Sequence, residues 1–342
     1  MDFQGFVLSG AHSFVTVALS TLVSSNTNST GCFTTLATGA FGSVQSTTLR
    51  TYAASTNFTF NGSSNQNTGN GVGANQVYNL TINTTAGATV TLTKPAGTSV
   101  VVTNTVNLAS GNLILSLCDL QLNNAASFTG GPWSTSNMVI TTGTGRSAGN
   151  GRVIKIFPNG AQTGLTFTFP IGENTGTVEY SPVNITNLTY TAATSPYVSY
   201  KVVDAKHPND PSINDYLTRY WIGLSSFPSG AGITMNANYN YLPGDVVGTE
   251  AVMKMNRYYS PTGSWTEDAG SSAGSNVLTS VTLNGATSPT PHDFDDHDIV
   301  ARLTVPLYYR SASAGPNIFE LGSSWIVSSD VNFIAPAGVA AT

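Results

Sequence analysis

One short stretch of this sequence concentrates groups that could bind a metal ion. It reads PHDFDDHD, residues 291–298, and holds four carboxylates and two imidazoles. Carboxylate oxygens are preferred Ca²⁺ ligands, but the order of an EF-hand loop is missing, and a zinc site would need a further ligand from elsewhere. The candidate calcium ligands are Asp293, Asp295, Asp296 and Asp298. A solvated acidic loop is the simpler interpretation, and we favour it.

A second polar stretch, DAKHPNDPSIND at residues 204–215, lies between two predicted strands. Its two prolines favour a rigid turn, and its Asp and Asn side chains are of the kind that cap turns through their own backbone. We therefore interpret this stretch as a structural loop rather than a reactive site.

Aromatic rings could stack on sugar rings. Tyr258 and Tyr259 are adjacent in a predicted strand, so their rings lie on opposite faces and one is exposed. Trp265 follows after a turn. Trp265 and Tyr258 are our candidate sugar-contacting residues, although aromatic residues near strand ends more often pack against the sheet.

The sequence does not supply the residues of a hydrolase. Between residues 25 and 145 the acidic residue is Asp119, whereas glycoside cleavage requires two carboxylates about 5 to 10 Å apart. GSSAG at 270–274 matches a nucleophile-elbow pattern around Ser272, but a strand-like segment follows it where a helix is required. We expect no catalytic residues and no cofactor other than a Ca²⁺ ion at 293–298.

Composition excludes two partner classes and indicates β-structure. Charged residues make up 8% of the 342-residue chain, the net charge is −5, and no run of Lys or Arg occurs, so nucleic acid is not expected as a partner. No apolar stretch approaches the roughly 20 residues of a membrane-spanning helix. Cys32 and Cys118 allow either one disulfide or two buried thiols.

The pattern of apolar residues predicts an all-β fold in two parts. In residues 25–145, pairs of apolar residues recur every 6 to 10 positions, roughly, which indicates very short strands joined by tight corners. We predict a right-handed parallel β-helix there, with an antiparallel β-sandwich as the rival. The inward pairs begin with Tyr78, Leu80 and Ile82. They continue with Val90, Leu92, Val100, Val102, Val106, Leu108, Leu113, Leu115, Leu120 and Leu122.

Residues 146–330 have longer alternating strands and predict an antiparallel β-sandwich. In ITMNANYNY the inward set is predicted to be Ile233, Met235, Ala237, Tyr239 and Tyr241. The tail 331–342 is small and uncharged, as in a linker or a cut end. Residues 1–24 alternate and form either the first strand or cap of their own chain, which we favour, or a donor strand for a neighbouring copy.

Two stretches carry a resemblance to known proteins. Residues 58–115, with FTFNG, VYNLTIN, AGATVTL and NLASGNLIL in that order, resemble the β-helical segment of large secreted and cell-surface proteins of the Bacteroidota. FPIGENTGTVEYSPV at 169–183, RYWIG at 219–223 and MNRYYSPTGSW at 255–265 resemble the β-sandwich that follows it in those proteins.

The resemblance implies export by the type IX route and a role as an adhesin, filament or matrix component. It supplies no catalytic residues. We find no C-terminal sorting domain after residue 285, so the resemblance implies that this domain is removed or that the sequence is part of a longer chain. We expect a non-enzymatic structural or adhesive protein, extracellular or at the cell surface, with copies of itself, other surface proteins or glycans as partners. The alternative is a carbohydrate-binding module of a larger secreted protein.

Overall fold

The computed structural model describes in full residues 1–36, 39, 41–85, 87–147, 149–227, 232–268, 270–280 and 296–303, and by backbone alone 283–284, 308–311, 325–328 and 339–340. In this part the chain is all-β, as predicted, with short 3-10 turns η2 (Pro243–Asp245) and η3 (Glu250–Val252). Among the described residues, no helix is both long and apolar enough to cross a membrane.

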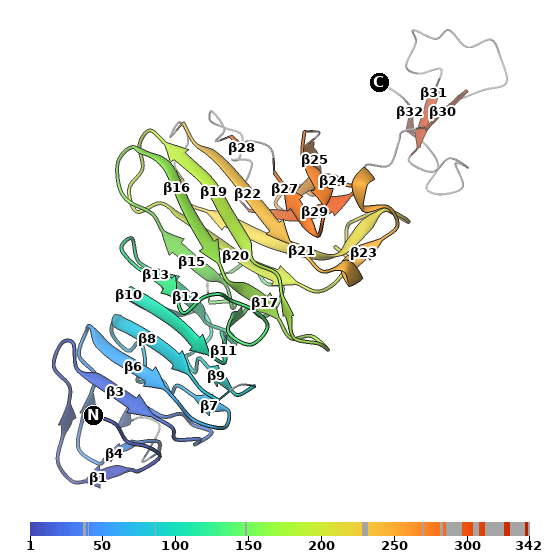
Figure 1. Ribbon diagram of the computed structural model, residues 1–342. Helices are drawn as coiled ribbons and strands as arrows, with labels where there is room; N and C mark the ends of the chain where they lie inside the picture. The colour runs from blue at the N-terminus through green and yellow to red at the C-terminus, as the bar shows by residue number, and fades with distance from the viewer. Residues whose placement is uncertain are drawn as a thin grey trace.

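The N-terminal half builds two series of parallel strands. The first series is β3 (Thr21–Ser24), β6 (Thr56–Phe60), β8 (Val77–Asn83), β10 (Ser99–Ser110), β12 (Asp119–Leu122) and β15 (Val153–Ile156), with β13 (Ser127–Thr129) also on β10. The second is β7 (Gln66–Asn67), β9 (Thr89–Thr91), β11 (Asn112–Ile114), β14 (Val139–Ile140) and β17 (Ile171–Glu173), followed by antiparallel β18 (Glu179–Tyr180). The chain alternates between the two series, so each new strand lies beside the strand of the previous circuit (Figure 1).

The first circuit contributes two further parallel pairs. β1 (Leu8–Gly10) pairs with β4 (Val44–Ser46), and β2 (Phe14–Val15) pairs with β5 (Arg50–Thr51). Because β2 and β3 both pair with strands of their own chain, the segment proposed as a donor strand is used within this molecule.

Apolar side chains stack in register inside the parallel half. One row runs through Leu22, Phe58, Leu80, Val106 and Phe128, all buried. The predicted inward residues from Leu80 to Leu122 are also buried, which confirms the alternation. Tyr78 is an exception: β8 contains a bulge after Val77, so Val77 points inward and Tyr78 is half-exposed.

Strand direction changes at β15. It pairs parallel with β12 on one side and antiparallel with β20 on the other. The first sheet then continues antiparallel through β20 (Tyr197–Val203), β21 (Tyr216–Ser225), β29 (His297–Arg302), β24 (Lys254–Tyr259) and β25 (Ser264–Asp268), with β23 (Val246–Val247) on β21. The predicted division between residues 145 and 146 falls shortly before this change, but the sheet itself runs across it.

A second antiparallel sheet holds β16 (Gln162–Phe169), β19 (Val183–Tyr190), β22 (Thr234–Asn240), β27 (Val277–Thr279), β26 (Ser272–Gly274) and β28 (Leu283–Asn284). β30 (Tyr308–Ser311), β31 (Trp325–Ser328) and β32 (Val339–Ala340) form a small sheet of their own. The five predicted inward residues from Ile233 to Tyr241 are buried. Tyr239 on β22 meets Tyr200 on β20, with their hydroxyl oxygens 3.0 Å apart.

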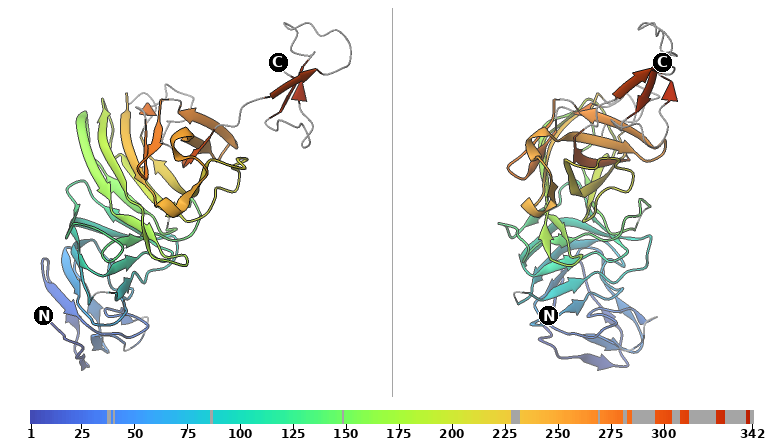
Figure 2. Two further views of the ribbon diagram at one scale, coloured as in Figure 1. Left: turned by 45° about the vertical axis from the view of Figure 1, so that its right-hand side comes forward. Right: turned by 90° about the vertical axis from the view of Figure 1, so that its right-hand side faces the viewer.

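One hydrophobic cluster extends from Phe3 to Ala301 and joins the parallel and antiparallel halves. The views of Figure 2 show an elongated arrangement with the N-terminus at one end and the antiparallel sheets toward the other. Cys32 and Cys118 are free, buried thiols, which resolves the alternative left open by the sequence. Because this hydrophobic cluster is continuous, the parallel and antiparallel halves share one core.

Candidate functional site

The two candidate sugar-contacting residues lie directly opposite each other. Tyr258 on β24 pairs with Trp265 on β25, and their ring centroids are 5.0 Å apart. The His207 ring lies 4.9 Å from Tyr258 and 5.2 Å from Trp265. The guanidinium carbon of Arg302 lies 4.5 Å from the centroid of Trp265. Both rings are half-buried, so much of their stacking surface is used inside the protein.

In the acidic stretch, the two carboxylates that the structure describes, those of Asp296 and Asp298, form ion pairs with Arg146. Arg146 Nη1 lies 2.5 Å from Asp296 Oδ1, and Arg146 Nη2 contacts Asp298 Oδ1. Asp298 Oδ2 lies 2.9 Å from His207 Nε2. A cation already occupies the space in front of these oxygens, so a metal ion would have to compete with Arg146. Asp293 and Asp295 lie outside the described residues, and calcium binding at this stretch stays a prediction.

The loop at 204–215 has the structural role expected of its capping side chains. Asp210 Oδ1 accepts a 3.0 Å hydrogen bond from the Ser212 amide, and Asp215 Oδ1 accepts one of 2.6 Å from the Thr249 amide. Asp204 is different, because its side chain reaches a charged cluster that sequence analysis did not identify.

That cluster surrounds Arg219, a fully buried residue of β21. Its Nε donates to Asp245 Oδ2 at 2.7 Å, and its Nη2 contacts Glu179 Oε2 and lies 3.4 Å from Asp204 Oδ1. Glu173 Oε1 lies 3.9 Å from Nη1. Four separate segments thus bring four carboxylates to one guanidinium on a fifth segment, β21. The signal in the sequence was Arg219 itself, a charge inside the strand RYWIG, but its partners are 15 to 46 residues away, as the numbering shows.

Glu173 is the least satisfied member of this cluster. It is 3% exposed, and its Oε2 accepts a 2.5 Å hydrogen bond from the Thr175 amide. Its Oε1 accepts no hydrogen bond from any described residue. Burial raises the pKa of this carboxyl above its ordinary value, and the neighbouring charge of Asp204 acts in the same direction. The cluster therefore has more carboxylates than Arg219 alone can pair with.

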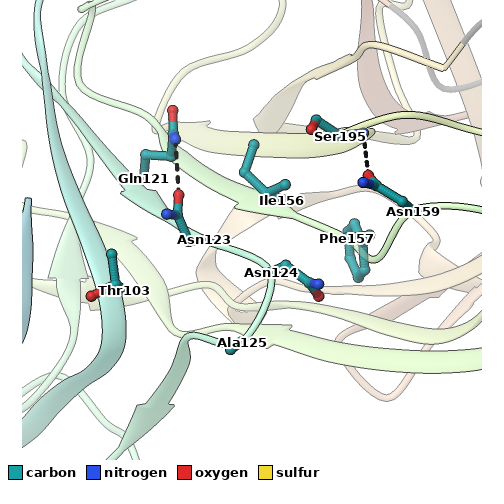
Figure 3. A pocket seen from close by; sticks show the side chains of 9 residues that line it. All are labelled: Thr103, Gln121, Asn123, Asn124, Ala125, Ile156, Phe157, Asn159 and Ser195. Atoms are coloured by element: carbon teal, nitrogen blue, oxygen red, sulfur yellow. Dashed lines mark hydrogen bonds between the residues drawn. The ribbon is translucent and has the colours of Figure 1, made fainter.

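A neutral pocket of about 450 Å³ lies beside β10, β12 and β15 and is also lined by the loops that follow β12 and β15 and the loop that precedes β20 (Figure 3). Its lining combines amide and hydroxyl groups with the edges of Ile156 and Phe157. Gln121 donates to Asn123 across 3.2 Å, and Asn159 accepts from the Ser195 amide at 2.6 Å.

Lys155 supports the turn that forms one wall of this pocket. This buried side chain donates from Nζ to the carbonyl oxygens of Asn123, Asn124 and Ala126 at 2.8, 2.7 and 2.7 Å. Desolvation by burial lowers the pKa of Lys155 to about 8. The sequence signal was weak, since one Lys in the short strand VIKI does not reveal which carbonyls it meets.

Comparison with known proteins does not assign this chain to a family. No protein-family model matches it, and no curated protein and no solved structure matches it either.

Proposed function

We propose that this protein is a non-enzymatic extracellular or cell-surface component that acts as a structural or adhesive rod. In this proposal residues 25–145 form a right-handed parallel β-helix, and residues 146–330 form an antiparallel sandwich that joins or binds other molecules. Parallel strands connected by a crossover almost always adopt the right-handed form.

The observation that carries the proposal is the register of the parallel strands. Each circuit places its apolar residues on those of the circuit before, as in the row from Leu22 to Phe128. Stability in such a stack grows from contacts between neighbouring circuits and requires no reactive group. A row of this kind suits a stiff spacer, which is the role that the resemblance of residues 58–115 to secreted Bacteroidota proteins implies.

The outer face of the stack also suits an extracellular spacer. Asn57, Asn79 and Asn104 form a chain of side-chain hydrogen bonds across neighbouring strands, each of 2.8 Å. This face also carries threonines such as Thr59 and Thr81. Because these contacts are uncharged, salt screens little of the cohesion that they provide.

The first circuit offers a place for copies to associate. β1 and β2 each have one partner strand in the described part of the chain, so one edge of each is open. Large apolar side chains are exposed on these two strands and elsewhere in the first 49 residues: Met1, Phe6, Val7, Leu8, Val15, Val17, Leu19, Leu36, Phe41 and Leu49. An open strand edge with apolar flanks is a typical site for strand addition. In our proposal a second copy binds there.

Negative-stain imaging and sedimentation of the wild-type protein over a range of concentrations test this proposal. We expect rods longer than one molecule, and their loss in the double variant Phe6→Ser, Val17→Ser. Ile213→Ser is the matched control, because Ile213 is 85% exposed but lies in the loop at 204–215. A wild-type protein that stays monomeric at every concentration would remove self-association from the proposal. Compact particles without an elongated stalk would contradict the rod.

The second candidate function is carbohydrate binding, and the pocket of Figure 3 favours it. Its amide and hydroxyl groups can hydrogen-bond a neutral sugar. A glycan array would compare wild type with Gln121→Ala for the pocket, and with Trp265→Ala and Tyr258→Ala for the aromatic pair. Binding that only Gln121→Ala abolishes would assign the pocket, and a blank wild-type array would count against this function.

A further inference from the structure

The cluster around Arg219 contains three carboxylates placed to share one cation. One oxygen each of Glu173, Glu179 and Asp204 lies within 4.8 Å of the other two. A Ca²⁺–oxygen bond measures about 2.3–2.6 Å, so oxygens up to about 4.6–5.2 Å apart can contact the same ion. Mg²⁺ bonds are about 2.0–2.1 Å long and need tighter, octahedral placement. The spacing therefore suits calcium better than magnesium.

The charges of the cluster leave room for a cation. Arg219 contributes one positive charge and meets four carboxylates, including Asp245, so the group carries a charge of −3 when all four are ionised. Nε of Arg219 is committed to Asp245, and Nη2 to Glu179. A divalent ion beside the remaining oxygens would bring the charge to −1.

Glu173 points independently to a missing partner. It is more than nine-tenths buried, and its Oε1 is without a hydrogen-bond donor among the described residues. A buried oxygen of this kind costs free energy unless a donor or a cation satisfies it. Arg219 Nη1 lies 3.9 Å away, which is too far for a hydrogen bond. The oxygen is thus oriented into the cluster without a close partner.

A neighbouring pocket gives an ion access to the cluster and offers further oxygen ligands. A pocket of about 290 Å³ adjoins the cluster and is lined by Glu173, Asp204, Asn174, Thr175 and Thr142, among others. Its amide, hydroxyl and carbonyl oxygens, together with water, could complete the six to eight ligands that Ca²⁺ takes, roughly. Every donor in this set is an oxygen, which disfavours zinc and copper.

We propose that Glu173, Glu179 and Asp204 bind one Ca²⁺ ion. The ion would join the β17–β18 hairpin to the end of β20, which belongs to the other sheet. It would thereby hold the parallel stack to the antiparallel sheets at the place where the fold changes. This site is separate from the acidic stretch at 293–298 and does not depend on the proposed function.

Calorimetric titration with CaCl₂ and thermal unfolding in CaCl₂ against EDTA test the site, with MgCl₂ as the comparison. We expect wild type to bind one Ca²⁺ and to unfold at a higher temperature in CaCl₂. Glu173→Gln should unfold in EDTA at the same temperature as wild type or higher, because it removes a buried charge whose Oε1 has no close partner. It should lose the response to CaCl₂.

Two further variants complete the test. Asp204→Asn is less buried than Glu173 and should also lose the response, which keeps the test open if Glu173→Gln does not fold. Asp296→Asn should retain it. Absence of any wild-type response, or a full response in both Glu173→Gln and Asp204→Asn, would overturn the site. Loss of the response in Asp296→Asn alone would move calcium to the acidic stretch and equally overturn it.

Discussion

Truncation of one inward side chain on β12 tests the stacked core. Leu120 is fully buried between Val100 of the circuit before and Val153 of the strand after. Gln121, the next residue, points outward and is half-exposed. The variants Leu120→Ala and Gln121→Ala therefore sample the two faces of one strand at the same level of the stack.

The expected magnitudes differ severalfold. Leu→Ala in a well-packed core costs about 2.7–5 kcal/mol, because the protein loses the free energy of burying the removed atoms and a cavity remains. Exposed substitutions usually change the free energy of unfolding by about 0.5 kcal/mol or less. At roughly 2–4 °C per kcal/mol for large domains, a loss of ~3 kcal/mol lowers the Tm by about 6–12 °C. Gln121→Ala should lower it by about 2 °C at most.

Differential scanning calorimetry is the assay. We expect one transition in wild type and in both variants, because one sheet and one hydrophobic cluster cross β15. Equal shifts in the two variants would refute the assignment of faces. Two transitions, of which Leu120→Ala moves only the first, would refute a shared core and favour the division between residues 145 and 146.

Four more outcomes follow from buried groups. Burial raises the pKa of Cys32 and of Cys118 to about 11, so both thiols should react with a disulfide reagent at pH 8 only after denaturation; rapid reaction in the native protein would contradict this. Lys155→Met leaves three carbonyls without their donor and should cost about 1–3 kcal/mol in urea unfolding at pH 7. Because the pKa of Lys155 falls from 10.5 to about 8 on folding, the unfolded state binds more protons between these values. As the pH rises from 8 to 10.5, the free energy of unfolding of wild type should therefore increase relative to that of Lys155→Met. If the two proteins show the same dependence on pH, the pKa of Lys155 is not lowered. Arg146→Met leaves Asp298 buried without its guanidinium and should cost up to about 3 kcal/mol, measured by the same unfolding; an unchanged midpoint would show that the pair contributes nothing.

Local patterns were enough to predict which face of most strands is buried. Period-2 alternation identified the inward residues from Ile233 to Tyr241 because a side chain's face depends only on its place in the pleat. The same rule failed at Tyr78, where the bulge after Val77 inserts a residue and shifts the faces. A bulge depends on the neighbouring strands, so this part of the chain could not reveal it alone.

The candidate sites also differ in whether their residues are close together or far apart in the sequence. Tyr258 and Trp265 could be named together because a hairpin brings residues close in the sequence into register. The carboxylates around Arg219 could not, since they come from separate strands and turns that only the packing of the two sheets brings together. The sequence by itself determined the all-β class, the low charge and most buried faces, which are local or compositional properties. The tertiary structure decided which strands are parallel, where direction changes and which charges meet, because these depend on contacts between segments far apart in the chain.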